Sequence, residues 1–367
     1  MIPATVIRPH IPSGRRVLVI SDIHGNLPFF QGLLKQVRFC KDDILILLGD
    51  MLEKGKQSLE LLRYIMELEK KHTVFPICGN CDGLVLRFFE DDNWDRGFFS
   101  AYLPAHPEST LRQLAAEMEF SHWDDLPAFR LAVRERYPEI WNWLKNLPTI
   151  LETERYVFVH GGVPSLEHME DLDSWKCMKN DNFLDQGHSF PKYVVVGHCP
   201  VTLYNPHIPS AAPIMDRERK IISIDGACVL KVDGQLNGFM ISDIAGDDWS
   251  WQAYDGLPVV TALDAQSPSE DSVNVRWGRS RLELLGRGEE FSRCIHVESG
   301  REINILNSYL REGPRGIWCE DSTDYRLPVS PGDRLSLVVS TSAGHLCKKD
   351  GVTGWYFGRI LDTLSEI

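Results

Sequence analysis

The chain contains the stretch Arg16-Val17-Leu18-Val19-Ile20-Ser21-Asp22-Ile23-His24-Gly25, which is followed by Ile44-Leu45-Ile46-Leu47-Leu48-Gly49-Asp50. A short run of Val, Ile and Leu bounded by turn residues predicts a strand buried on both faces, as in a parallel sheet covered by helices. Asp22 and His24 are two residues apart, so in extended backbone their side chains lie on one face and can reach one ion. Both project from the carboxyl end of a strand, where open α/β sheets bind ligands.

The chain continues with alternating helix and strand patterns. Residues 26–39 place apolar residues at helical spacing after Asn26, a good N-cap residue, and residues 58–70 repeat the pattern. Thr73-Val74-Phe75-Pro76-Ile77-Cys78 predicts a third strand, and Gly79-Asn80-Cys81-Asp82 follows it. A strand, helix, strand, helix, strand order is typical of right-handed crossovers in a parallel sheet.

Two later apolar runs also end in histidine. Tyr156-Val157-Phe158-Val159 is followed by His160-Gly161-Gly162, and Tyr193-Val194-Val195-Val196 is followed by Gly197-His198. Unpaired carboxylates and imidazoles at the ends of buried strands are costly unless they bind something. We therefore expect one site that combines the side chains of Asp22, His24, Asp50, Asn80, His160 and His198.

With these motifs the chain resembles the calcineurin-like metallophosphoesterase superfamily over about residues 15 to 255. The resemblance implies a four-layer α/β/β/α sandwich with two metal ions at the strand ends. It implies that Asp22, His24 and Asp50 bind one ion and that Asp50 bridges to a second ion. The second ion would be held by Asn80, His160 and His198. This mixture of imidazole, amide and carboxylate ligands suits Mn, Fe, Zn or Ni better than Ca, and the choice among them stays open.

Within the superfamily, the chain is most similar to the branch of phosphoprotein phosphatases and symmetrical diadenosine tetraphosphatases. The resemblance rests on Gly49-Asp50-Met51-Leu52-Glu53-Lys54-Gly55, on Leu147-Pro148, on His160-Gly161-Gly162-Val163-Pro164 and on Ile222-Ser223-Ile224-Asp225-Gly226-Ala227. Phosphodiesterases of the superfamily often end in Gly-His-x-His, whereas Pro200 occupies the second histidine position here.

Three positions depart from the pattern of that branch. Cys81 stands where the family has the histidine that protonates the leaving oxygen, and Glu53 replaces the Asp that orients this histidine. Lys54 replaces an Arg, and an ammonium orients phosphate less firmly than a guanidinium. We take Cys81, Asp82 and Lys54 as candidate catalytic residues, with Cys81, Asp82 or a metal-bound water as the acid.

The expected function is hydrolysis of a phosphate ester by a hydroxide activated by two metal ions. A phosphatase of the serine/threonine phosphatase-like type is the first candidate. A dinucleoside polyphosphate hydrolase, a phosphodiesterase and a metal-binding scaffold with weakened catalysis are the alternatives. Substrates would then be a phosphorylated small molecule, a nucleotide or a phosphoprotein. The pair Cys78 and Cys81 also matches a redox Cys-x-x-Cys motif, although Cys78 closes a strand and fits a core position.

Sequence patterns divide the chain into three parts. Residues 1–258 would form the metallophosphoesterase domain, with a mainly helical insert at about 83–150 that could cap the site. Residues 259–275 are expected to form a linker, because residues 265–272 within them are polar and include Pro268. Residues 276–367 contain short β-like runs punctuated by Gly and Pro, which predict a small all-β domain, weakly similar to an SH3-like barrel, for a protein partner or self-association.

Composition narrows the class of protein further. The 367 residues carry a formal net charge of -13, so no basic surplus is available for nucleic acid or anionic membranes. Long apolar runs are absent, which predicts no membrane span, and the N-terminus does not resemble a secretory signal. Nine scattered cysteines indicate reduced thiols and a cytoplasmic location.

Overall fold

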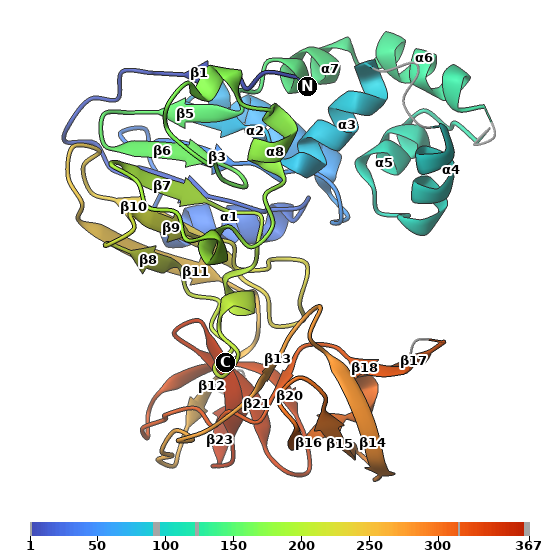
Figure 1. Ribbon diagram of the computed structural model, residues 1–367, viewed down its shortest axis with the longest axis vertical. Coiled ribbons are helices and arrows are strands. Elements are labelled where there is room, and N and C mark those ends of the chain that lie inside the picture. Colours follow the sequence, from blue (N-terminus) through green and yellow to red (C-terminus); the bar gives the residue numbers. More distant parts are fainter. Residues whose placement is uncertain (1, 91–95, 122–124, 315, 363–367) are drawn as a thin grey trace. The chain divides into compact units, whose positions relative to one another are not determined.

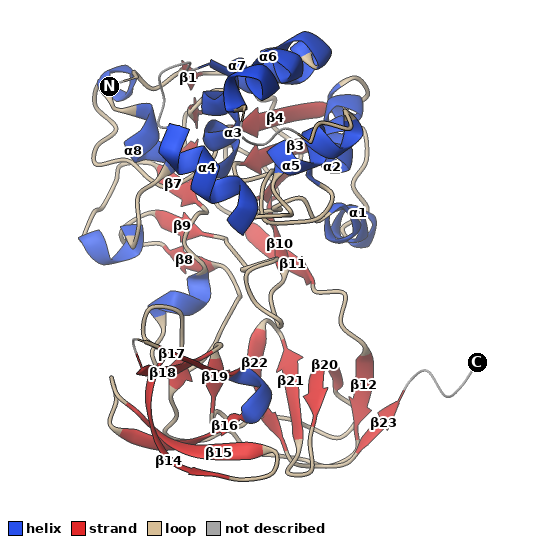
Figure 2. Ribbon diagram, turned by 90° about the vertical axis from the view of Figure 1, so that its right-hand side faces the viewer, coloured by secondary structure: helices blue, strands red, loops and turns tan. Residues whose placement is uncertain are grey.

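The computed structural model describes residues 2–90, 96–121, 125–314 and 316–362 (Figures 1 and 2). The chain divides into two compact units, each with its own sheets. The N-terminal unit comprises Met1–Cys199, Pro213–Val229 and Leu236–Tyr254. The C-terminal unit comprises Pro200–Ala212, Leu230–Gln235 and Asp255–Ile367.

A five-stranded sheet with the order β11-β10-β2-β3-β4 carries the first three motifs. Its strands are β2 (Val17–Ile20), β3 (Ile44–Leu48), β4 (Thr73–Ile77), β10 (Leu236–Ile241) and β11 (Trp249–Tyr254). β2, β3 and β4 are parallel, and helices α1 (Leu27–Gln36) and α2 (Ser58–Glu69) connect them. The Asn26 side chain accepts a hydrogen bond from the backbone of Phe29 and caps α1. The predicted parallel strands with connecting helices are therefore confirmed.

A six-stranded sheet with the order β1-β5-β6-β7-β9-β8 carries the two histidine motifs. Its strands are β1 (Val6–Ile7), β5 (Ile150–Glu152), β6 (Tyr156–Val159), β7 (Tyr193–Val196), β8 (Ile214–Asp216) and β9 (Ile221–Ser223). β6, β7 and β9 run parallel, so the residues that follow β6 and β7 emerge at the same edge. The segments between β6 and β7 include η1 (Met169–Asp171), α8 (Ser174–Met178) and η2 (Phe183–Gln186).

Alternate residues of each strand enter different hydrophobic clusters. Val17 and Val19 of β2 pack with Tyr156 and Phe158 of β6 in a cluster between the two sheets. Leu18 and the other residues that point the opposite way pack against α1 and α2. This alternation follows from the period of two in a strand and gives a helix layer, a sheet and a second sheet. The mixed α/β fold is thus confirmed.

The insert after β4 is helical over the residues described. It contains α3 (Asn80–Glu90), α4 (Arg96–Ala105), α5 (Thr110–Glu117), α6 (Leu126–Arg136) and α7 (Pro138–Lys145), which lie together at one end of the sheets in Figure 1. Phe88, Phe99 and Phe129 of the insert are fully buried and join the same cluster as α1 and α2. The insert is therefore built into the core of the N-terminal unit.

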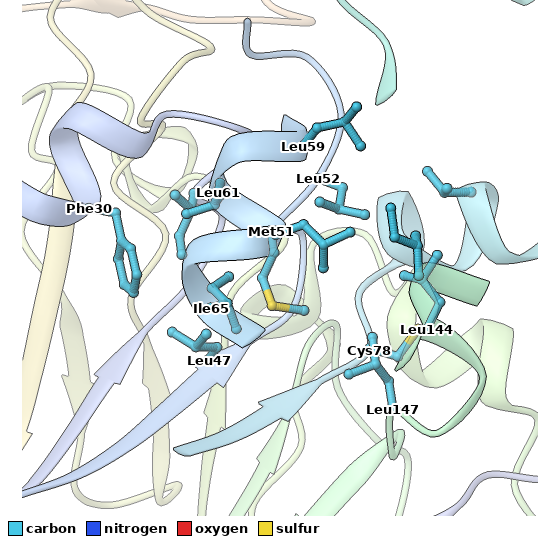
Figure 3. Packing of buried hydrophobic residues seen from close by; sticks show 14 of the residues in the cluster. Phe30, Leu47, Met51, Leu52, Leu59, Leu61, Ile65, Cys78, Leu144 and Leu147 are labelled. Atoms are coloured by element: carbon cyan, nitrogen blue, oxygen red, sulfur yellow. The ribbon is translucent and has the colours of Figure 1, made fainter. Parts of the chain in front are cut away.

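Figure 3 shows how this core holds the loop that follows β3. Met51 and Leu52, the residues directly after Asp50, are fully buried in the cluster with Ile65 of α2. Burying such side chains contributes about 1.5 to 3 kcal/mol each. The loop that carries Asp50 is therefore anchored on both sides by apolar contacts.

The C-terminal unit is rich in strands, but its sheets do not close into a barrel among the residues described. The sheet orders are β22-β21-β20-β12-β23 and β16-β15-β14-β18-β17, with β13 and β19 as a separate pair. The bounds are β12 (Val259–Ala262), β13 (Asn274–Val275), β14 (Arg281–Arg287), β15 (Phe291–His296), β16 (Arg301–Leu306), β17 (Leu310–Gly313), β18 (Gly316–Cys319), β19 (Ser322–Thr323), β20 (Arg334–Ser340), β21 (His345–Lys349), β22 (Val352–Tyr356) and β23 (Ile360–Asp362), with η3 (Val201–Tyr204) and η4 (Asn307–Tyr309). The resemblance to an SH3-like barrel is not confirmed.

The expected linker at residues 259–275 differs from the structure. β12 pairs with both β20 and β23, and β13 pairs with β19, so both ends of this stretch belong to sheets. Polar residues in this stretch predicted a linker, but β12 needs only two buried residues, Val260 and Ala262, to pack in a sheet. Residues of Pro200–Ala212 and Leu230–Gln235 also group with the C-terminal unit, which sequence order did not reveal.

No helix in the described parts of the chain is long and apolar enough to cross a membrane.

Gly55 is a position where the fold requires glycine. A Cβ there would overlap the carbonyl oxygen of His24 and lie 2.9 Å from the carbonyl carbon of Gly25. We expect Gly55→Ala to lower the free energy of unfolding by about 2 to 4 kcal/mol, because backbone atoms must move to make room. Urea denaturation measures this change, with Gly286→Ala as the control, since a Cβ at Gly286 meets nothing within 4 Å. Equal stability of both variants would contradict the prediction.

Candidate metal centre

The loops after the strands adopt backbone conformations that most residues avoid. Asp22, His24, Asp50 and His198 have φ values of 55°, 49°, 49° and 66°. A positive φ is uncommon for residues other than glycine, and such residues cluster at ligand sites. Thirteen described residues other than glycine have positive φ, and six of them lie in these loops: Asp22, His24, Asp50, Glu53, Lys54 and His198.

The loops bring carboxylates and imidazoles together in a buried cluster. Ligand atoms of Asp22, Asp50 and His160 lie within 4.8 Å of one another, and those of His24, Asp50 and Cys81 do the same. The Nε2 atom of His160 is 3.3 Å from Oδ1 of Asp50, and the Nε2 atom of His24 is 3.8 Å from Oδ2 of Asp50. Asp50 belongs to both groups, as a residue that bridges two ions would.

Backbone carbonyl groups orient two of the histidines. Nδ1 of His160 lies 2.8 Å from the carbonyl oxygen of Leu48, and Nδ1 of His24 lies 3.3 Å from that of Leu52. Because a carbonyl oxygen only accepts, Nδ1 is the protonated nitrogen in each ring. Nε2 is then left as a lone-pair donor that faces the carboxylates, which is the form that binds metals.

Several buried polar atoms of the cluster have no hydrogen-bond partner among the residues described. They are Nε2 of His160, Oδ1 of Asn80 and Oδ2 of Asp225. Burial, together with the charge of Asp22, raises the pKa of Asp225 well above its ordinary value, and burial also raises the pKa of Asp22. Leaving such atoms unpaired is costly, and a divalent cation satisfies both the unpaired atoms and the crowded carboxylates. The residues therefore fit a metal centre.

His198 reaches the cluster through its backbone and its ring. Its N–H donates to Oδ2 of Asp22 at 3.0 Å, and its ring centroid lies 5.3 Å from that of His160. Its Nε2 atom is 2.7 Å from Oδ1 of Asp181, an exposed residue that the sequence did not single out. A carboxylate on one ring nitrogen fixes the ring and directs the other nitrogen to a metal.

Lys54 and Cys81 both lie at the cluster. Nζ of Lys54 is 3.2 Å from Nε2 of His24. The Cys81 N–H donates to Oδ1 of Asp50 at 2.7 Å, and its side chain is buried. Burial and the charge of Asp50 raise the pKa of the Cys81 thiol well above its ordinary value. Burial likewise raises the pKa of Cys78, which packs in the core, so neither thiol resembles a redox-active thiolate.

Asp82 lies between two loops of the site, and burial together with the charge of Asp50 raises its pKa to about 7. Its Oδ1 accepts hydrogen bonds from the backbone N–H groups of Met51 and Leu52 at 3.1 and 3.0 Å, and its Oδ2 accepts one from Gly79 at 2.9 Å. The side chain is fully buried. Asp82 thus connects the loop after β3 to the loop after β4.

Besides Asp181, two further features of the site were not foreseen from the sequence. Asp225 lies in the quoted stretch Ile222–Ala227, where a carboxylate after an apolar run could have indicated it. Glu53 accepts hydrogen bonds from the Tyr102 hydroxyl at 2.5 Å and from the Thr110 N–H at 2.8 Å. Glu53 therefore holds the insert, and no local pattern indicated this because Tyr102 is distant in sequence.

A buried cluster of carboxylates and imidazoles at the ends of strands from two facing sheets defines a class of metal-dependent hydrolases. The sequence profile of the calcineurin-like phosphoesterases matches residues 15–220, and the chain belongs to this family. The family depends on two metal ions.

Curated relatives share part of this chain. A protein of Erwinia tasmaniensis named bis(5'-nucleosyl)-tetraphosphatase, symmetrical, is 31% identical over 148 residues, which cover 40% of this chain and 43% of the relative. A protein of the same name from Nitrosococcus oceani is 27% identical over 151 residues, covering 40% of this chain and 44% of the relative. The match thus spans less than half the length of these relatives.

Solved structures with weaker likeness include a protein serine/threonine phosphatase from Saccharomyces cerevisiae, with 11% identity and a TM-score of 0.41 over 70% of this chain and 84% of that chain. A cold-active protein-tyrosine phosphatase of a Shewanella species has 16% identity and a TM-score of 0.40 over 69% and 80%.

Proposed function

We propose that the chain is a phosphoesterase with a dinuclear metal centre and that its substrate is a dinucleoside polyphosphate, of which it hydrolyses a phosphoanhydride bond. The observation that carries the proposal is the buried cluster around Asp50, in which His160 and Asn80 present unpartnered ligand atoms. The names of the curated relatives support the nucleotide. The serine/threonine phosphatase-like activity that the sequence favoured becomes the second candidate.

The proposed ligands keep the division between two ions that the family resemblance implies. Asp22, His24 and Asp50 would hold one ion, and Asp50, Asn80, His160 and His198 the other. When bound, such a pair of divalent ions neutralises phosphate charge and supplies a nucleophile at neutral pH. The donor set suits Mn, Fe, Zn or Ni. Asp181 would orient His198 from outside the cluster, because it lies at the Nε2 side of the ring.

Lys54 is proposed to bind a non-bridging phosphate oxygen. Its ammonium lies beside His24 at the edge of the cluster, and the charges of the nearby carboxylates, acting against the effect of desolvation, raise its pKa. Lys54 would therefore remain positively charged and offset the charge of the substrate. An ammonium tolerates several phosphate orientations, which suits a polyphosphate chain better than a single fixed ester.

The residue at position 81 also favours a polyphosphate over phosphoserine. Serine leaves as a strongly basic alkoxide that needs a proton, whereas a nucleoside polyphosphate leaves as a stable anion. The branch places histidine at this position, and Cys81 here is buried with a raised pKa. Cys81 stays the proposed proton donor, but the geometry of Asp82 favours a structural task for that residue.

We expect Cys81→His to raise turnover of a phosphoserine peptide by about 100-fold and turnover of diadenosine tetraphosphate by far less, because only the alkoxide needs the added acid. Steady-state kinetics with Mn-loaded protein measure both rates. The exposed Cys40 provides the control variant Cys40→His. Equal increases in turnover of both substrates would contradict the role assigned to residue 81. So would unchanged turnover of the peptide by the metal-loaded variant.

The proposed function is tested with a substrate panel on Mn-loaded full-length chain. The panel holds p-nitrophenyl phosphate, bis-p-nitrophenyl phosphate, a phosphoserine peptide and diadenosine tetraphosphate. The highest kcat/KM for diadenosine tetraphosphate would support the proposal. Preference for the peptide would establish the phosphatase, and preference for the diester would establish a phosphodiesterase. If the chain binds two metal ions but hydrolyses none of these substrates, it is a metal-binding scaffold.

The C-terminal unit is proposed to bind a protein partner or a second copy of the chain. It contains a cavity of about 650 Å³ whose lining includes Phe291, Arg301, Arg326, Trp355 and Phe357. Cavities of this size are common binding sites. Size-exclusion chromatography with light scattering would detect self-association. The cytoplasmic location stays a prediction.

A further inference from the structure

Part of the polar stretch that was expected to be a linker lines the cavity of about 650 Å³ in the C-terminal unit. The residues of this stretch at the cavity are Pro268, Ser269, Glu270 and Asp271. Arg326 also lines the cavity, and its backbone N–H donates to Oγ of Ser269 at 2.7 Å, which ties the stretch to the rest of the lining. Ligand pockets measure roughly 300 to 1,000 Å³, so this cavity can hold a side chain together with its neighbouring backbone.

Aromatic rings form another part of the lining. Phe291 of β15, Trp355 of β22 and Phe357 line the cavity, and Phe357 is 49% exposed. The ring centroids of Trp355 and Phe357 are 6.3 Å apart at an interplanar angle of 17°, and those of Phe291 and Trp355 are 5.8 Å apart. Nε1 of Trp355 donates to the carbonyl oxygen of Thr323 at 2.8 Å and so fixes its ring. We call Phe291, Trp355 and Phe357 the aromatic wall, which is formed before any ligand binds.

Carboxylates outnumber guanidinium groups around the cavity. The lining contains four acidic residues and two basic ones: Glu270, Asp271, Glu302, Asp324, Arg301 and Arg326. Arg293 lies outside the lining and is 3.1 Å from Glu302. Even when Arg293 is counted, four negative charges face three positive ones at neutral pH. The cavity therefore favours a cation and disfavours a phosphate group.

Two arginines of the lining show which cation fits. The guanidinium carbon of Arg326 lies 5.4 Å from the ring centroid of Phe357, whereas Arg301 donates to Oδ2 of Asp324 and to Oδ2 of Asp271, both at 2.5 Å. A guanidinium is planar and weakly hydrated, so it stacks on rings and also binds carboxylates through a fork of N–H groups. An ammonium is a strongly hydrated point charge and stacks less well. Rings and carboxylates line the same cavity, so one incoming arginine could make both contacts.

We propose that this cavity binds an arginine side chain of an extended segment of a partner protein. The guanidinium would stack on the aromatic wall and pair with Glu270, a carboxylate that makes no ion pair with any of the residues described. The inference rests on the proposed binding role of the C-terminal unit and adds the chemistry of the partner. It is independent of the metal centre, whose proposed substrate is an anion.

The test measures binding of short peptides to the full-length chain by calorimetry, with peptide concentrations into the millimolar range. The probes are four tripeptides, acetylated and amidated, with leucine at both ends and arginine, lysine, citrulline or glutamate in the middle. Citrulline has nearly the shape of arginine but no charge. We expect the arginine peptide to bind about tenfold more tightly than the citrulline peptide, and more tightly than the lysine peptide, because only arginine combines the charge with a planar group.

Two exposed positions of the lining supply variants that leave the cores of the unit intact. Glu270→Gln removes a charge and Phe357→Leu removes a ring, and each should reduce the preference for arginine over citrulline several-fold. The matched controls are Glu283→Gln and Trp277→Leu. Both of these residues are exposed and belong to the same unit, but they lie outside the lining.

The outcomes decide between an arginine and other occupants. Equal affinity for the arginine and citrulline peptides, tighter binding of the glutamate peptide, or no binding of any peptide would overturn the proposal. So would an unchanged preference in both cavity variants, while equal affinity for the lysine peptide would reject arginine as the specific occupant. If light scattering shows a dimer that dissociates in Phe357→Leu, and no peptide binds selectively, the cavity is a site of self-association.

A parallel measurement keeps this inference apart from the proposed catalytic function. Turnover of diadenosine tetraphosphate by the Mn-loaded wild-type chain is measured on the same preparation. Turnover without selective binding of the arginine peptide would reject the inference and leave the hydrolase. Selective binding without turnover of any substrate would reject the hydrolase and support the arginine site.

Discussion

Asp50→Asn is expected to lower metal-dependent turnover by on the order of a thousandfold and to reduce the metal content of the chain. Asp50 is the residue that the two groups of potential ligands share, and it is 1% exposed. Asparagine keeps the shape but removes the negative charge and replaces one ligand oxygen by an amide nitrogen that only donates. The negative charge that would lie between two ions of like charge is then lost.

Two measurements check this expectation independently of each other. Turnover of diadenosine tetraphosphate reports on catalysis, and elemental analysis after gel filtration reports on bound metal. The control is Asp42→Asn, because Asp42 is an exposed aspartate outside the cluster. Chelation should also lower the melting temperature of the wild-type chain more than that of Asp50→Asn, since a ligand that binds only the folded state stabilises it. Full metal content and turnover in Asp50→Asn would reject the proposed centre.

The parts of the site that the sequence predicted lie within a few residues of a strand. Asp22, His24, Asp50, His160 and His198 each follow an apolar run, and parallel strands must deliver their ends to one edge. The order of strands in each sheet was not predictable in this way. Strand β10 pairs with its neighbour β2 through residues more than 200 positions apart.

The contacts that side chains of the insert make could not be predicted from the sequence either. Glu53 follows the metal-ligand motif, but its partners Tyr102 and Thr110 lie on α4 and α5 of the insert. The sequence around these two residues does not indicate that they bind Glu53. Asp82 illustrates a related limit, since a carboxylate beside Asn80 suits proton donation as well as capping. Only the positions of the backbone N–H groups distinguish these two tasks.

In the C-terminal unit, the sequence pattern predicts strands but not how the strands are arranged in sheets. Short β-like runs predicted an all-β region, and strands do occupy it. The same runs do not encode whether the strands close into a barrel or separate into sheets. Here Val260 and Leu335 pack in one cluster and Cys294 and Ile305 in another, so two open sheets each have their own core.

Asp82→Ala is expected to cost roughly 3 to 5 kcal/mol of unfolding free energy, the largest effect on stability among the variants considered. Its carboxylate accepts three backbone hydrogen bonds from Met51, Leu52 and Gly79, and the side chain is fully buried. Removal leaves three N–H groups in the interior without an acceptor. Each such group costs about 1 to 3 kcal/mol, partly offset by relaxation and water entry.

Asp82→Asn separates a structural task from proton donation. The amide retains one acceptor oxygen, but its NH₂ group faces an N–H donor, so the variant should also lose stability, by about 1 to 3 kcal/mol. Urea denaturation of the metal-free chain measures both variants, and Asp42→Ala serves as the exposed control. If Asp82 acted only as an acid, Asp82→Asn would have the same unfolding free energy as the wild-type chain and would lose only its turnover. If Asp82→Asn is as stable as the wild-type chain but catalyses slowly, Asp82 is a catalytic residue.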